Sequence, residues 1–156
     1  MIQNWYYYYI SYEDLKDALK TDYETEPAPE NPKPKRKPWT EEDEQRFVRQ
    51  LEEELDKVFT FQKVKSQEIV RRIKASEKEV NDGIARQRAA EEQRDGQTDR
   101  PTEEEFMLLE EDLSDVIADV HDLAKFTQLN YTGFQKIIKK HDVGLEDCSH
   151  ICEHHR

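Results

Sequence analysis

A long proline-free stretch of apolar residues at helical spacing constrains this chain more than any other feature. The apolar positions are mostly three, four or seven residues apart, which is the period of an α-helix. We expect one helix from about residue 41 to residue 93, starting after Thr40. At 1.5 Å of rise per residue it would be ~80 Å long. Its apolar stripe consists of Phe47, Leu51, Leu55, Val58, Phe61, Val64, Ile69, Ile73, Val80 and Ile84.

A second apolar stripe follows after a short break at residues 95–97. Thr102 and Glu105 have the spacing of a reciprocal capping pair, so a second long helix should begin there. Its stripe is Phe106, Leu109, Leu113, Ile117, Val120, Leu123 and Phe126 or Leu129. Two long stripes joined by a short turn predict an antiparallel hairpin whose apolar faces form the core.

Shorter helices are expected on either side of this hairpin. Ser11 and Asp14 have capping spacing, and the helix after Ser11 should reach about Lys20, with Tyr12 and Lys16 on one face. Residues 21–38 hold five of the six prolines and should form a flexible loop. We predict an all-α fold: an elongated helical bundle with two long antiparallel helices plus short N-terminal and C-terminal helices, the last over about 131–141.

The short C-terminal helix carries a compact basic island. Lysines stand at positions 136, 139 and 140 on a chain of net charge -12. At about 100° per residue these lysines share one face, while Phe134, Ile137 and Ile138 occupy the other. One face can pack on a core while the other holds cations towards solvent. The pattern fits either a receptor for a compact polyanion or an ordinary solvated helix face.

Composition excludes several functional classes. The acidic balance argues against nucleic-acid binding. No apolar run approaches the ~20 residues of a membrane span, and no signal peptide is visible, so we expect a cytoplasmic chain without membrane insertion. Neither a catalytic triad nor a glycine-rich phosphate loop is present. The cysteines and histidines at 148–155 are too crowded for a closed zinc finger, so we predict no metal, no cofactor and no catalytic residue.

Four segments, in order, resemble the SPX domain family. They are Tyr8-Tyr9-Ile10-Ser11-Tyr12-Glu13-Asp14-Leu15-Lys16, Leu55-Asp56-Lys57-Val58-Phe59-Thr60-Phe61, the stretch 113–126, and Leu129-Asn130-Tyr131-Thr132-Gly133-Phe134-Gln135-Lys136-Ile137-Ile138-Lys139-Lys140-His141-Asp142. The resemblance covers roughly residues 5–142. It is strongest to the SPX domains that stand at the N-terminus of fungal vacuolar transporter chaperone subunits.

The resemblance implies a non-catalytic sensor of inositol polyphosphates and inositol pyrophosphates that acts in phosphate homeostasis and regulates polyphosphate synthesis. It places a phosphate-binding cluster at Tyr12, Lys16 and Lys140, with Lys136 and Lys139 in a second cluster. Lysine ammonium groups suit several phosphates, and a tyrosine hydroxyl adds a directed donor. Implied partners are vacuolar transporter chaperone subunits or other phosphate-pathway proteins, at the cytosolic face of the vacuolar membrane.

The chain also departs from the family pattern. We expect an SPX domain over residues 1–142 that lacks most of its first helix, followed by an atypical, disordered tail at 143–156. Val143 replaces a usual lysine, and the polymerase catalytic domain is absent, so we predict no enzyme activity. The alternative from another class is a helical-hairpin (coiled-coil) interaction or scaffold protein that binds no ligand.

Overall fold

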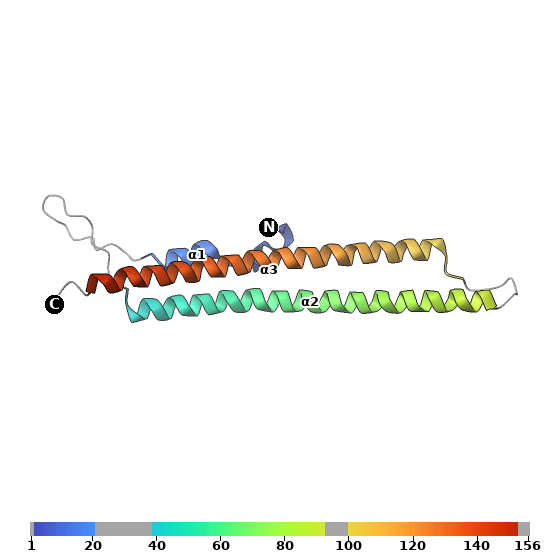
Figure 1. Ribbon diagram of the computed structural model, residues 1–156, viewed down its shortest axis with the longest axis horizontal. Coiled ribbons are helices and arrows are strands. Elements are labelled where there is room, and N and C mark those ends of the chain that lie inside the picture. The colour runs from blue at the N-terminus through green and yellow to red at the C-terminus, as the bar shows by residue number, and fades with distance from the viewer. Residues whose placement is uncertain (1, 21–38, 93–99, 153–156) are drawn as a thin grey trace. The chain divides into compact units, whose positions relative to one another are not determined.

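The computed structural model describes the backbone of residues 2–20, 39–92 and 100–152, and side chains as far as residue 143. Every regular element in these residues is a helix, which confirms the all-α fold (Figure 1). The proline-rich loop and the side chains of the Cys/His tail lie outside the described residues. In chain order the elements are a 3₁₀ helix η1 (Gln3–Tyr8), α1 (Tyr12–Ala18), α2 (Glu41–Glu92) and α3 (Glu103–Cys152).

Both long helices begin at reciprocal caps. At α3, the Glu105 amide donates to the Thr102 hydroxyl (3.2 Å) and the Thr102 amide donates to the Glu105 carboxylate (2.7 Å), as predicted. That second hydrogen bond is the main cause of the lowered pKa of Glu105. At α2, Thr40 and Asp43 exchange the same two bonds at 3.2 and 3.1 Å. These caps satisfy backbone donors that lack helical partners, so the predicted start of each helix is confirmed.

Helix α3 is longer than predicted, and the separate short C-terminal helix does not exist. The backbone stays helical from Glu103 to Cys152 without interruption, past residue 142. Gly133 lies inside the helix, where a Cβ would stand 2.9 Å from Cγ2 of Ile10. The glycine therefore makes room for a neighbouring segment rather than ending the helix.

The chain divides into two compact units, and residues 61–127 form one of them. In this hairpin unit the last part of α2 and the first part of α3 lie side by side and antiparallel, as predicted (Figure 1). Ile69, Val116 and Phe126 are buried between them. Arg72 pairs with Asp119, and Arg86 pairs with Glu105 at 3.1 Å.

The apolar stripes are only partly buried, which corrects the expectation that they form the core throughout. Two packed helices share a single seam, so each buries a narrower strip than it would in a larger bundle. Val116 occupies the seam of α3, whereas Ile117 is 58% exposed. The other stripe residues that remain exposed are Leu55, Val64, Ile73, Ile84, Phe106, Leu113, Val120 and Leu129.

Candidate anion-binding site

The other unit comprises residues 3–60 and 128–156, and it contains every predicted binding residue. Its core joins three helices through Leu15 of α1, Phe47 of α2 and Ile137 of α3, each at most 2% exposed. Because Leu15 packs against the other two, α1 lies against α3 near its lysines (Figure 1). The residues that pack around this core are Ile10, Tyr12, Ala18, Leu19, Trp39 and Leu51.

The start of α1 is held by α2 and not by its own side chains. Ser11 makes no side-chain capping hydrogen bond, so the predicted pair with Asp14 is wrong. Instead the Ser11 amide donates to Oε2 of Glu54 (2.7 Å), and its hydroxyl donates to Oε1 of the same carboxylate (3.2 Å). Lys57 donates to both Glu54 oxygens and to the Ser11 hydroxyl. The carboxylate of α2 thus replaces a local cap with a stronger charge-assisted one.

The segment before α1 is fixed on α3 by Asn130. This side chain is 1% exposed, and its Oδ1 accepts a hydrogen bond from the Ile10 amide at 2.8 Å. One turn further along α3, Gly133 lets the Ile10 side chain approach closely. Asn130 and Gly133 therefore position α1 beside the lysine segment.

Tyr12 and Lys16 lie one turn apart on α1, as expected. Tyr12 packs partly buried on the core. Lys16 pairs with Glu13 at 2.7 Å, and its side chain is 33% exposed. The hydrogen bond that Lys16 donates to Glu13, together with the negative charge of Glu13, raises the pKa of Lys16. An arriving polyanion would have to compete with Glu13 for this ammonium group.

The apolar side of the lysine segment is narrower than predicted. Ile137 is fully buried and Phe134 is half-buried, but Ile138 is 46% exposed. Only the first two therefore face the core. Ile138 lies about 100° further round the helix, outside the area that α1 and α2 cover.

Two of the three lysines lie beside the segment that leads into α1. Gly133, Lys136, Ile137 and Lys140 have spacings of three, four and seven, so they share a helix face. Ile10 contacts that face at Gly133. Both lysines are exposed, and among the described residues neither forms an ion pair. They can hold an anion at the junction of α1 and α3.

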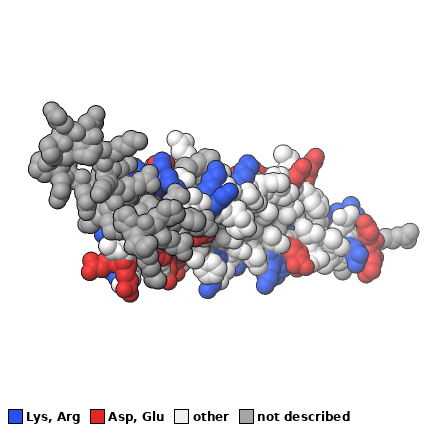
Figure 2. Space-filling view, turned by 60° about the vertical axis from the view of Figure 1, so that its left-hand side comes forward, with Lys and Arg blue, Asp and Glu red and all other residues white. Residues whose placement is uncertain are grey.

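Lys139 is placed differently. It lies about 200° round the helix from the buried Ile137, and it is exposed. Tyr12 packs on the core of this unit, Lys136 and Lys140 share the helix face of Gly133, and Lys139 lies on the outer side of α3. In Figure 2 the Lys and Arg side chains stand in separate groups among other residues, so a basic focus must be a local feature.

Sequence reasoning did not find a hydrogen-bonded group formed by His141, Glu44 and Trp39, which is called the clasp below. Nε2 of His141 lies 2.8 Å from Oε2 of Glu44, and the His141 ring stacks on Phe47 with centroids 4.9 Å apart. The indole N–H of Trp39 donates to the same Glu44 oxygen (2.9 Å). Burial lowers the pKa of His141, but hydrogen bonds to Glu44 and Asp142 outweigh it, so the pKa is raised. The clasp fixes the start of α2 against α3 one residue after Lys140.

This clasp predicts a pH dependence of stability. A raised pKa means that protonated His141 stabilises the fold fully below its ordinary pKa of 6.5, and that this stabilisation is lost as the pH rises through the folded-state pKa. The lowered pKa of Glu44 keeps its carboxylate ionised over this range. We expect the free energy of unfolding, measured with urea, to fall as the pH rises above 6.5. The variant His141→Gln should lose this slope, and parallel curves for the two proteins would contradict the role of the clasp.

No family model matches the chain, but it is similar in sequence to several curated proteins. It is 42% identical over 136 residues to vacuolar transporter chaperone complex subunit 4 of Schizosaccharomyces pombe, covering 87% of this chain and 16% of that protein. It is 34% identical over 139 residues to subunit 2 of Saccharomyces cerevisiae, covering 86% of this chain and 14% of that protein. SPX domain-containing protein 1 of Oryza sativa subsp. indica is 34% identical over 96 residues, covering 62% and 28%.

The chain is homologous to SPX domain proteins. This confirms the resemblance drawn from its four segments, and it links the chain to subunits of the vacuolar transporter chaperone complex. The SPX-related chain spans less than a fifth of the length of the two chaperone subunits. Among the described residues no helix is long and apolar enough to cross a membrane.

Proposed function

We propose that this SPX-related chain is a non-catalytic sensor that binds inositol polyphosphates or inositol pyrophosphates in phosphate homeostasis. The observation that carries the proposal is the pair Lys136 and Lys140, two ammonium groups without carboxylate partners among the described residues, beside the docked helix α1. On a chain of net charge -12, two such cations beside a tyrosine and a third lysine favour a compact anion with several phosphates.

The proposal extends to how the signal is used. Tyr12 and Lys16 belong to α1, while the three lysines belong to α3, so a ligand bound to both would tighten their contact. That change would alter docking to a linked domain or to vacuolar transporter chaperone subunits, and through them polyphosphate synthesis. Such partners would hold the chain at the cytosolic face of the vacuolar membrane. The chain itself would catalyse no reaction.

The test is calorimetric titration with inositol hexakisphosphate at physiological salt. We expect the triple variant Lys136→Ala, Lys139→Ala, Lys140→Ala to bind roughly 100-fold more weakly, because charge-assisted contacts to phosphate are lost. The matched control removes the same charge from exposed lysines of the hairpin unit, as Lys63→Ala, Lys74→Ala, Lys78→Ala. Equal affinity of the lysine-site triple variant and the unmodified chain would refute the site.

The single lysine variants should differ in how much they weaken the binding of inositol hexakisphosphate. Lys136 and Lys140 lie on the face that borders α1, whereas Lys139 points to the outer side. Lys140→Ala should therefore weaken binding more than Lys139→Ala. The reverse order would place the ligand away from α1.

A second candidate, a helical-hairpin interaction protein, is favoured by the exposed apolar residues of the hairpin unit, such as Ile117 and Met107. Exposed apolar area of this kind often marks an interaction surface. This function requires that the chain dimerises in a concentration-dependent way and that it binds no inositol phosphate. The two candidates therefore separate in one sedimentation experiment with and without ligand.

A further inference from the structure

The hairpin unit contains a groove that the sensor function does not use. It lies between the last turns of α2 and the first turns of α3 and has a volume of about 780 Å³. All of its lining residues belong to the hairpin unit. It is therefore separate from the lysine site, which belongs to the other unit.

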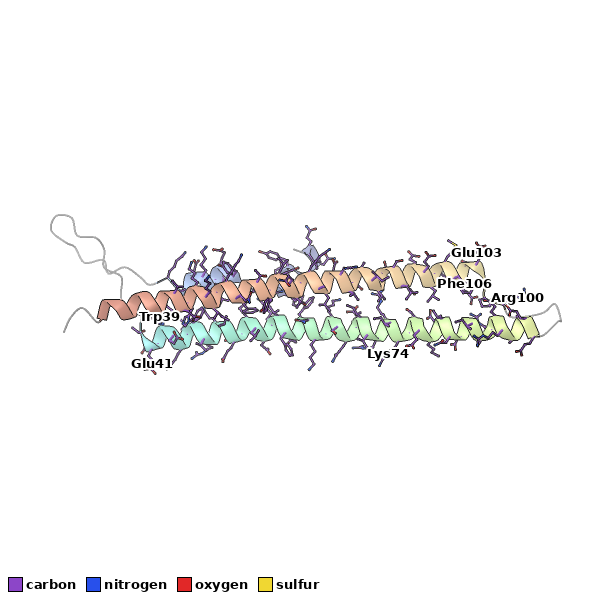
Figure 3. The ribbon with its side chains drawn as sticks, in the orientation of Figure 1. Trp39, Glu41, Lys74, Arg100, Glu103 and Phe106 are labelled. Carbon is purple, nitrogen blue, oxygen red and sulfur yellow. The ribbon has the colours of Figure 1, made fainter. Side chains whose placement is uncertain are left out.

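Part of the groove's lining is apolar and is called its floor here. It consists of Pro101, Leu108 and Leu109, and Leu108 is 58% exposed. Phe106 and, on the α2 side, Gly83 also line the groove. Figure 3 shows Phe106 at the start of α3, close to Glu103 and Arg100. Large side chains left open to water in a groove favour coverage by another apolar surface.

The rim of the groove is acidic. Four carboxylates and a single guanidinium line it, and that guanidinium, Arg86, is paired with Glu105. Glu79, Asp82 and Asp112 form no ion pair among the residues that the structure describes. Three negative charges therefore border the apolar floor without compensation, and they favour a cationic occupant.

The groove runs along the helices. Its α2 residues Glu79, Asp82 and Arg86 are three and four residues apart, and its α3 residues Glu105, Leu108 and Asp112 repeat the same steps. Seven residues correspond to about 10 Å of helix axis. An elongated occupant parallel to α2 and α3 fits this shape, as a third helix fits the groove of a two-helix layer.

We propose that this groove docks a basic amphipathic helix of another protein. The apolar face of that helix covers Leu108 and Leu109, while its Lys or Arg side chains reach Glu79, Asp82 and Asp112. This is the helix-in-groove mode of recognition, in which apolar anchors give affinity and charges give orientation. It provides the acidic chain with a protein-binding surface in addition to its anion site.

The test uses the full chain and a synthetic amphipathic peptide of Leu and Lys, about four helical turns long, labelled for fluorescence anisotropy. We expect saturable one-to-one binding that weakens about tenfold in the variant Glu79→Gln, Asp82→Asn, Asp112→Asn. The matched control is Glu52→Gln, Glu53→Gln, Asp56→Asn, which removes the same charge from exposed positions of α2 outside the groove. The affinity of the control variant for the peptide should stay within about twofold of that of the unmodified chain.

A second arm tests the apolar floor. Leu108→Gln should also weaken binding about tenfold, and because Leu108 is already 58% exposed, the fold should tolerate the change. A peptide of the same composition in a scrambled, non-amphipathic order should not bind.

Equal weakening by the two acid-to-amide triples would overturn the proposal, because the peptide would then be held by net charge alone. The proposal would also be overturned if the chain formed concentration-dependent dimers that Leu108→Gln abolished. The occupant of the groove would then be a second copy of the chain. Binding of inositol hexakisphosphate should be unchanged in every groove variant, so this proposal and the sensor proposal can fail independently.

Discussion

Replacing Phe47 by alanine is expected to lower the free energy of unfolding by about 3–5 kcal/mol, the range for a buried phenylalanine truncated in a core. The ring is 2% exposed and packs with Leu15 and Ile137. It also stacks on His141 with an interplanar angle of 8°. The substitution therefore removes both the apolar contact among three helices and the support of the Glu44–His141 clasp.

Urea denaturation followed by tryptophan fluorescence measures this loss, because Trp39 packs on the same core and the other tryptophan, Trp5, belongs to the same unit. The control is Phe59→Ala on the same helix, where the ring is 60% exposed. It should cost less than about 1 kcal/mol, as exposed substitutions usually do. If Phe47→Ala does not fold, Phe47→Leu keeps most of the volume and should cost about 1.5 kcal/mol. Equal losses at the two phenylalanines would contradict the assigned core.

The helix boundaries were predictable because their signals are local. A period of three and four residues marks the course of α2, and a cap three residues from its partner marks the start of each long helix. These signals did not show that α3 continues through Gly133, because a glycine can end a helix or admit a neighbour. Only the position of Ile10 distinguishes these two roles.

The buried faces were harder to predict because burial depends on what packs against a helix. The periodic pattern placed Ile117 in the apolar stripe and left out Val116, and only the packing against α2 shows that Val116 is the buried residue of the two. The contacts that build the candidate site also join distant positions. Ile10 and Asn130 are 120 residues apart, and Glu44 and His141 are 97 apart. No local pattern in the sequence pairs them.

The five proposed binding residues were selected by resemblance, and the structure adds a distinction among the lysines. Spacing alone put Lys136, Lys139 and Lys140 on one face. Ile10, which precedes α1, approaches Gly133, and helical spacing places the first and last of these lysines on the face of Gly133. A physical distinction within the lysine cluster thus depends on a glycine and an isoleucine that carry no charge.

Replacing Ile137 by alanine is expected to affect stability and ligand binding together. Ile137 is fully buried at the contact between α1 and α3, so truncation should cost about 2–5 kcal/mol. It should also weaken binding of inositol hexakisphosphate, although no charge changes. The reason is that, in the proposed site, Tyr12 and Lys16 can share a ligand with the lysines only while α1 stays docked. Apparent affinity falls in proportion to the docked fraction.

The neighbouring residue provides the control for this prediction. Ile138→Ala removes the same atoms from a side chain that is 46% exposed, and it should cost less than about 1 kcal/mol and leave binding unchanged. Urea denaturation and calorimetric titration are compared at a temperature where both variants are folded. If Ile137→Ala lost stability but bound as tightly as Ile138→Ala, the phosphates would be held by α3 alone. Tyr12 and Lys16 would then have no part in the site, and the ligand could not report on the contact between the two helices.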